Sequence, residues 1–102
     1  MRTKDISVNL ELCDELFNKL QFIEHYIRSI ECNYKYIMTI TSGKDGKHMN
    51  NSLHYRGKAI DIRCRDMANP ILVTNSLKSG LGGDFDVIYE KDHIHIEFDK
   101  KY

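Results

Sequence analysis

The sequence has no excess of charge of either sign. Fifteen lysine and arginine residues balance fifteen aspartate and glutamate residues. A protein that attracts a phosphate backbone or an anionic lipid surface through general electrostatics carries a cationic surplus. We therefore expect neither nucleic acid nor a membrane as a partner, and a metal-dependent nuclease is a weak candidate among functional classes.

Long apolar runs are also lacking, and so is an N-terminal segment of the secretory type. No window approaches the roughly 20 apolar residues of a membrane helix. Residues 1–9 include Arg2, Lys4 and Asp5 and have no apolar centre like that of a signal peptide. We expect a soluble protein that is cytoplasmic when made.

Proline and cysteine are scarce. One proline and six glycines in 102 residues argue against a disordered or collagen-like chain. The three cysteines, Cys13, Cys32 and Cys64, are odd in number and lack CxxC spacing, which indicates reduced thiols rather than a disulfide framework. The length predicts one domain over residues 1–102, which we expect to act as a monomer.

The hydrophobic pattern predicts an α+β fold. An apolar stripe with spacings of three and four predicts a long N-terminal helix, and it consists of Cys13, Leu16, Leu20, Ile23, Ile27 and Ile30. Asn69-Pro70 predicts the start of a second, short helix that runs to about Ser79 and is stopped by Gly80. Strands are expected at 34–41, 57–64, 85–89 and 93–98, the last two forming a hairpin. We expect a small antiparallel sheet packed against both helices.

Candidate chemistry is clearest in the final strand. His93, His95 and Glu97 alternate with apolar residues, so one face of the strand is apolar and the other carries ligand-type side chains. Two imidazoles on one strand face can hold a divalent transition metal. By itself this HxH pattern is a weak signal, because such residues are more often ordinary surface side chains.

A second motif supplies the missing ligands. His54 ends a polar loop over residues 42–55, and Asp61 lies on the outward face of the strand that follows. Together with one histidine of the final strand they make three nitrogen and oxygen ligands and leave a fourth position for water. This is the composition of a catalytic zinc site rather than a closed structural one.

The ordered pair of motifs, SxHxxGxAxD over residues 52–61 and then DHIHIEF, resembles the family of zinc D-alanyl-D-alanine carboxypeptidases and L-alanyl-D-glutamate endopeptidases, which includes phage endolysins. The hedgehog fold and lysostaphin-type enzymes resemble it more distantly. The similarity extends from about Ile40 to Phe98. It implies a hedgehog/DD-peptidase-like fold, zinc as cofactor and a peptidoglycan peptide as substrate. By position, His54, Asp61 and His95 match the metal ligands of the family.

The resemblance leaves the acid/base residue open. His93 and Asp92 both match catalytic neighbours of the ligand histidine, and strand parity puts His93 on the face of His95 while Asp92 falls at the turn. A shifted alignment would make Glu90 the base and His93 the ligand.

The same resemblance leaves the contacts with substrate open. Ser52 matches a polar position of the motif, and Lys44 stands where relatives often have an arginine that binds a substrate carboxylate. That role could instead fall to Arg56 or Arg63. Carboxypeptidase and endopeptidase activity both remain possible, and a zinc-containing hedgehog-like binding module without turnover is the alternative. The small size suggests an enzyme of phage or prophage origin that acts on the cell wall after release.

Overall fold

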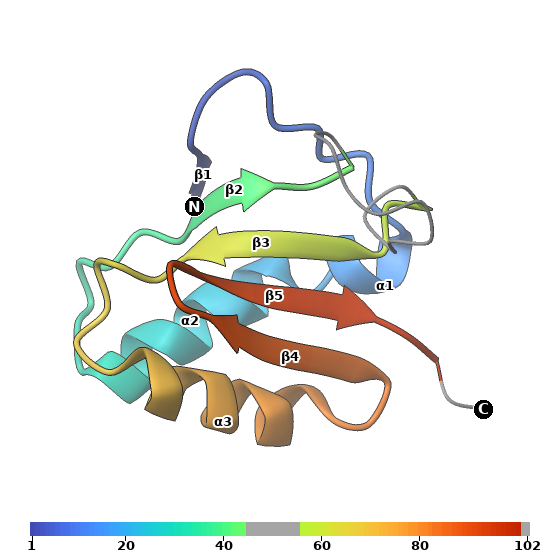
Figure 1. Ribbon diagram of the computed structural model, residues 1–102. Helices are drawn as coiled ribbons and strands as arrows, with labels where there is room; N and C mark the ends of the chain where they lie inside the picture. Colours follow the sequence, from blue (N-terminus) through green and yellow to red (C-terminus); the bar gives the residue numbers. More distant parts are fainter. Residues whose placement is uncertain (45–55, 101–102) are drawn as a thin grey trace.

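The computed structural model describes residues 1–44 and 56–100. Figure 1 shows the order of elements, which is β1 (Arg2–Thr3), α1 (Asp14–Phe17), α2 (Leu20–Glu31), β2 (Thr39–Ser42), β3 (Ala59–Arg63), α3 (Pro70–Leu81), β4 (Phe85–Glu90) and β5 (His93–Phe98). The fold is a small α+β arrangement, as the sequence predicts. No helix among these residues is long and apolar enough to cross a bilayer.

The strands form one sheet in the order β1-β2-β3-β5-β4. Strand β1 runs parallel to β2, whereas the other neighbours are antiparallel. The sheet is therefore mixed, and our expectation of an antiparallel sheet is wrong at this edge. Two residues are too few to show an alternating pattern, and β1 is fixed by backbone bonds from Arg2 N–H to Met38 O and from Lys4 N–H to Ile40 O, each 2.9 Å long.

The predicted N-terminal helix is divided into α1 and α2. At Lys19 the backbone N–H donates to Leu16 O, three residues back, which tightens the chain into a turn between the two helices. The apolar stripe nevertheless continues across the break, because Leu16, Leu20, Ile23 and Ile27 are all buried. The prediction that this apolar stripe packs against the core is confirmed, but the prediction of one continuous helix is wrong.

Helix α3 begins as predicted and ends later. The Asn69 side chain accepts a hydrogen bond of 3.1 Å from the Leu72 N–H, and Pro70 follows the cap. Gly80 does not stop the helix, which continues to Leu81 and has the same length as α2. A Cβ added at Gly80 would lie 2.6 Å from Cε1 of Tyr26, so this glycine allows α2 and α3 to pack closely.

The strand predictions hold with changed bounds. The β4–β5 hairpin is confirmed, with a turn at Lys91, whose φ is +51°, and Asp92. Strand β2 starts at Thr39 rather than residue 34, because the preceding segment is tied to the end of α2. Arg28 Nε donates to Tyr36 O at 2.7 Å, and Tyr36 N–H donates to Asn33 O.

The core lies between the sheet and the helices. Figure 1 shows α2 and α3 along one face of the sheet. Fully buried side chains from the strands, Ile40, Ile60, Ile62, Ile94 and Ile96, pack against those of the helices, among them Val73 and Leu77. The opposite face is polar wherever the strand pattern alternates. The three cysteines are free thiols, as expected.

Candidate functional site

The polar face of the sheet brings together side chains from three neighbouring strands. Strands β3 and β5 are in continuous register, which pairs Asp61 with His95, Arg63 with His93 and Ala59 with Glu97. Strand β4 adds Asp86, Ile88 and Glu90 opposite the same three residues of β5. The alternation that the sequence predicts for residues 59–63 and 93–98 is confirmed, so Asp61 of the first motif lies on one surface with His93 and His95 of the second.

Asp61 and His95 form the closest pair on this face. Oδ1 of Asp61 lies 2.9 Å from Nδ1 of His95, and each side chain is only 14% exposed. The second ring nitrogen of His95, Nε2, lies 2.8 Å from Oε1 of Glu97. Both nitrogens of this imidazole therefore face a carboxylate, and its ring orientation is fixed from two sides.

This environment changes the acidity of His95. Burial acts to lower its pKa, but the hydrogen bonds to Asp61 and Glu97 and the charges of these carboxylates outweigh burial, so the pKa lies above its ordinary value. A metal at His95 would therefore compete with a proton that these two carboxylates stabilise on the imidazole.

His93 lies beside this pair and is oriented by the turn. Its Nδ1 is 2.6 Å from Oδ1 of Asp92, and this hydrogen bond holds the pKa of Asp92 below its usual range. Its Nε2 faces Oδ1 of Asp61 at 3.8 Å and Oε2 of Glu90 at 3.6 Å. Asp92 lies in the turn and contacts the ring of His93, which in turn faces Asp61. The two candidate acid/base residues are therefore joined by a hydrogen bond.

His54 and Ser52 lie outside the described residues, but the chain on both sides of them is well anchored. Lys44 N–H donates to Asn9 O, and Cys13 N–H donates to Gly57 O, each at 2.8 Å. Gly43 and Gly57 both pack so tightly against this N-terminal segment that an added Cβ would collide with a backbone carbonyl oxygen, that of Asn9 or Glu11. Residues 9–13 therefore hold both ends of the loop predicted to be functional.

The predicted substrate contacts are separated by the fold. Lys44 is exposed, and its Nζ lies 3.5 Å from Oε2 of Glu11. Arg56 is also exposed. Arg63 is half-buried and stands opposite His93 on the polar face. Of these cations Arg63 is the one that the sheet register places next to Asp61 and His93.

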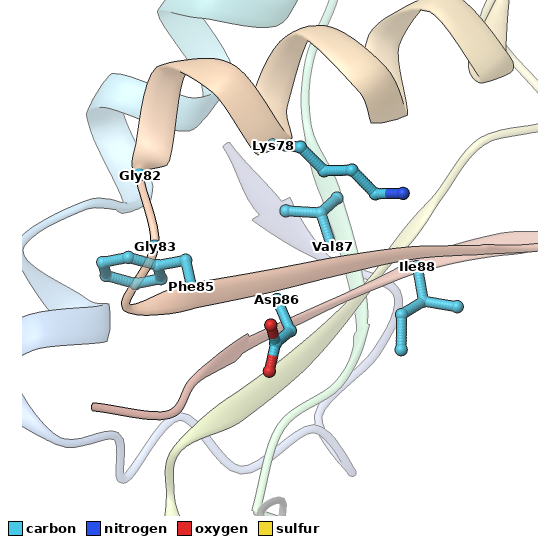
Figure 2. A pocket seen from close by; sticks show the side chains of 7 residues that line it. All are labelled: Lys78, Gly82, Gly83, Phe85, Asp86, Val87 and Ile88. Carbon is cyan, nitrogen blue, oxygen red and sulfur yellow. The ribbon is translucent and has the colours of Figure 1, made fainter. Parts of the chain in front are cut away.

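Two further features adjoin the same strands. Asp86, Glu97 and Asp99 have ligand-type atoms within 4.8 Å of one another. A hollow of about 530 Å³ lies between the end of α3 and β4, and Figure 2 shows Val87 directed toward the helix and Asp86 directed away from it. The hollow is lined by none of Asp61, His93 and His95.

The donor set fits a zinc ion on chemical grounds. Asp61 and His95 offer one oxygen and one nitrogen donor side by side, and zinc binds both types. In addition, a metal-bound histidine usually donates its second ring N–H to a carboxylate, which is the position of Glu97. Sequence reasoning assigned no role to Glu97, although its spacing from His95 already placed it on the same strand face.

Comparison with known proteins agrees with this architecture. A family profile described as the Hedgehog amino-terminal signalling domain matches residues 8–97. The matched region contains the first motif, the second motif except its last residue, Phe98, and every element from α1 to β4, with most of β5. No curated protein matches the sequence. Because the profile spans most of the chain, the chain belongs to the family of the Hedgehog amino-terminal signalling domain.

Proposed function

We propose that the protein is a zinc-dependent peptidase that hydrolyses peptide bonds in bacterial peptidoglycan. The observation that carries the proposal is the pairing of Asp61 with His95 on the polar face of the sheet, with His93 directed at the same carboxylate. Further support comes from the similarity of the two motifs to zinc D-alanyl-D-alanine carboxypeptidases and L-alanyl-D-glutamate endopeptidases. The hedgehog-like fold to which the family match points is compatible with this assignment.

In this proposal His54, Asp61 and His95 hold the metal, and Glu97 orients His95. A zinc ion bound there would lower the pKa of a water molecule and polarise the carbonyl of the scissile bond. Glu97 keeps the imidazole of His95 from rotating, since it holds Nε2 at 2.8 Å while Nδ1 faces Asp61.

His93 is the proposed acid/base. Asp92 accepts a hydrogen bond from Nδ1–H of His93, which leaves Nε2 able to accept a proton from the attacking water and to donate it to the leaving amine. Nε2 is also the atom of His93 that faces Asp61. Asp92 then acts as a positioning residue, which is consistent with a carboxylate whose side chain is 85% exposed.

The alternative is a zinc-containing binding module that has no turnover. It uses the same Asp61 and His95 but gives His93 no role in proton transfer. Family membership alone favours neither function, because it identifies the fold rather than a reaction.

The test is hydrolysis of purified peptidoglycan, followed by release of new amino groups. We expect the protein to release amines and His93→Ala to lose at least about 100-fold in rate while retaining zinc, because general acid/base catalysis contributes roughly that factor or more. His25→Ala, which removes an exposed histidine from α2, is the control and should match the unmodified protein. Absence of amine release from zinc-loaded protein would favour the binding module.

A further inference from the structure

Strand β4 is the last strand of the sheet and has an open edge. In the described part of the chain it pairs with β5 alone. Asp99 N–H donates to Asp84 O at 2.8 Å, so the backbone of residue 84 faces β5. In an antiparallel ladder successive residues direct their backbone groups alternately toward the two sides of the strand. The N–H and C=O groups of Val87 and Tyr89 therefore point outward, away from β5.

The hollow between α3 and β4 lies along this edge. Its lining includes Phe85 and Val87 of β4 and Lys78 of α3, and Figure 2 shows the Lys78 side chain extending over Val87. Lys78 is exposed, and it forms no ion pair with a carboxylate among residues 1–44 and 56–100. A strand added to β4 would run beside the hollow and direct every second side chain toward it.

Large apolar side chains are exposed on the same two elements. Ile71 and Leu72 are exposed at the start of α3, and Ile88 and Tyr89 are exposed on β4. Helix α3 packs against β4 and lies along it in Figure 1. Exposed apolar side chains that gather at one part of a surface are typical of an interaction site. The edge thus combines outward backbone groups with apolar surface.

The charges of β4 argue against a second copy of the chain as the occupant. Two copies would pair antiparallel about a two-fold axis, and facing residues would have to lie on the same side of the sheet. A pairing centred on Ile88 places Asp86 of each copy opposite Glu90 of the other, and like charges in that position are destabilising. A pairing centred on Val87 requires the N–H of Phe85, which already donates within the turn before β4.

The same charges define the partner that fits. Asp86 and Glu90 lie on the polar face of β4, two positions to either side of Ile88, whereas Lys78 lies on the helix side of the edge. An added strand therefore meets negative charge on one of its faces, and positive charge with apolar surface on the other.

We infer that the open edge of β4 binds an extended segment of another protein, antiparallel to β4, with basic side chains facing Asp86 and Glu90 and with apolar and acidic side chains facing α3 and Lys78. Hydrogen bonds to the backbone of Val87 and Tyr89 supply affinity, and the two faces supply specificity. This interaction goes beyond the proposed hydrolysis and does not depend on it.

The test uses a designed peptide, acetylated and amidated, with the sequence Lys-Val-Ile-Glu-Lys-Val, which runs from the position opposite Glu90 to the position opposite Phe85. The control peptide, Glu-Val-Ile-Lys-Glu-Val, has the charges reversed. Binding is followed by the backbone amide shifts of the protein in NMR titrations. We expect the designed peptide to bind at least about tenfold more tightly than the control, because three cross-strand charge pairs change from attraction to repulsion.

Two N-methylated forms of the designed peptide test the backbone pairing. The second and fourth residues stand opposite Tyr89 and Val87, so their N–H groups face β4. Methylation of these two nitrogens should abolish binding, whereas methylation of the third and fifth, whose N–H groups face away from β4, should leave it within about threefold. Equal effects of the two forms would overturn strand addition.

Variants of the protein test the same two features. Tyr89→Pro removes an outward N–H and keeps the ladder with β5, so designed-peptide binding should fall at least about tenfold, whereas Tyr89→Val should retain it. Lys78→Glu should weaken the designed peptide and strengthen the charge-reversed one. Lys35→Glu, at an exposed position away from α3 and β4, is its control and should change neither. Thermal unfolding checks that each variant is folded at the assay temperature.

The remaining outcomes also decide. Amide shifts confined to α3 and residues 85–90, with the expected order of the two peptides, support the inference. Equal binding of the two peptides, no binding of either at millimolar concentration, or shifts centred on β3 would overturn it. A dimer in size-exclusion chromatography that Tyr89→Pro dissociates would show that a second copy occupies the edge, and would also contradict the inference.

Discussion

Asp61 on β3 and His95 on β5 stand opposite each other in the sheet, and Oδ1 of Asp61 lies 2.9 Å from Nδ1 of His95. The pair joins two motifs that are more than thirty residues apart in sequence. Because both residues point away from the buried face of continuous strands, their relative position is set by the sheet register rather than by a loop. Such rigid support is what a metal or catalytic site requires.

Glu97 should tune metal affinity through His95. Glu97→Gln keeps the size of the side chain but removes the charge that faces Nε2 of His95 at 2.8 Å. We expect zinc affinity to fall by about tenfold, the lower end of the range for residues that orient a metal ligand. Competition with a fluorescent zinc chelator measures this. Glu90→Gln, on the same face beside His93, is the control, and an equal loss there would argue against a specific role for Glu97.

The glycine at the end of the predicted functional loop should be essential for stability. Gly57 has a φ of +68°, and an added Cβ would also collide with Glu11 O. We expect Gly57→Ala to cost about 3 kcal/mol in free energy of unfolding, measured with urea. Gly83→Ala is the control, because nothing lies within 4 Å of the added Cβ there and Gly83 is not in the positive-φ region. A loss at Gly57 no larger than that at Gly83 would show that neither the positive φ nor the collision matters.

Glu24 should make stability depend on pH. Burial opposes its ionisation, but bonds from the N-terminal amino group and from Met38 N–H, with the charge of Arg28, hold its pKa below the usual value. Its contribution is therefore complete above the unfolded pKa of about 4.3 and is lost as pH falls through the lower folded pKa.

Unfolding of Glu24→Gln across pH 7 to 3 tests this dependence. We expect the variant to be less stable by about 2 kcal/mol at pH 7, and the difference to shrink below about pH 4. Glu15→Gln, an exposed change on α1, should follow the unmodified protein at every pH. A difference that stays constant down to pH 3 would be inconsistent with a lowered pKa.

Tyr36 offers a stabilising change. Its side chain is 4% exposed, and among the described residues its hydroxyl oxygen is buried without a hydrogen-bond partner. Burial also raises the pKa of the phenol, so the group stays neutral. We expect Tyr36→Phe to raise the free energy of unfolding by about 1 kcal/mol, since a buried unsatisfied hydroxyl is removed. Tyr34→Phe, at an exposed position, should be neutral, and a loss of stability at residue 36 would indicate a hidden partner for the hydroxyl.

Helices and strands whose apolar residues recur at regular spacing could be predicted from sequence. Features that depend on tertiary contacts could not. The alternation at residues 93–98 and the cap at Asn69 gave β5 and the start of α3 correctly. The end of α3 was wrong, because Gly80 is required by the nearby Tyr26 ring, which no local pattern reveals. The parallel strand β1 was missed for a similar reason, since a strand of two residues is too short to show alternating apolar and polar side chains.

For the site, strand parity correctly placed Asp61, His93 and His95 on one face. It also put Asp92 in the turn, but it could not show that Asp92 binds the ring of His93. The hollow lined by Lys4, Arg63 and Arg65 was not predictable, because Lys4 comes near Arg63 only through the pairing of β1 with the sheet. The assignments of His54 and Ser52 fall on residues outside the described part of the chain and stay predictions.

The most direct test of the account is the zinc content of metal-replete protein by elemental analysis, for the unmodified chain, Asp61→Asn and Asp86→Asn. The proposal predicts about one zinc per chain in the unmodified protein and in Asp86→Asn, and loss of zinc in Asp61→Asn. Asp86 is the matched control, because it lies on the same face and its loss would remove zinc only if the ion were bound by the acidic group of Asp86, Glu97 and Asp99. Zinc retained by Asp61→Asn, or lost from Asp86→Asn, would contradict a metal site at Asp61 and His95.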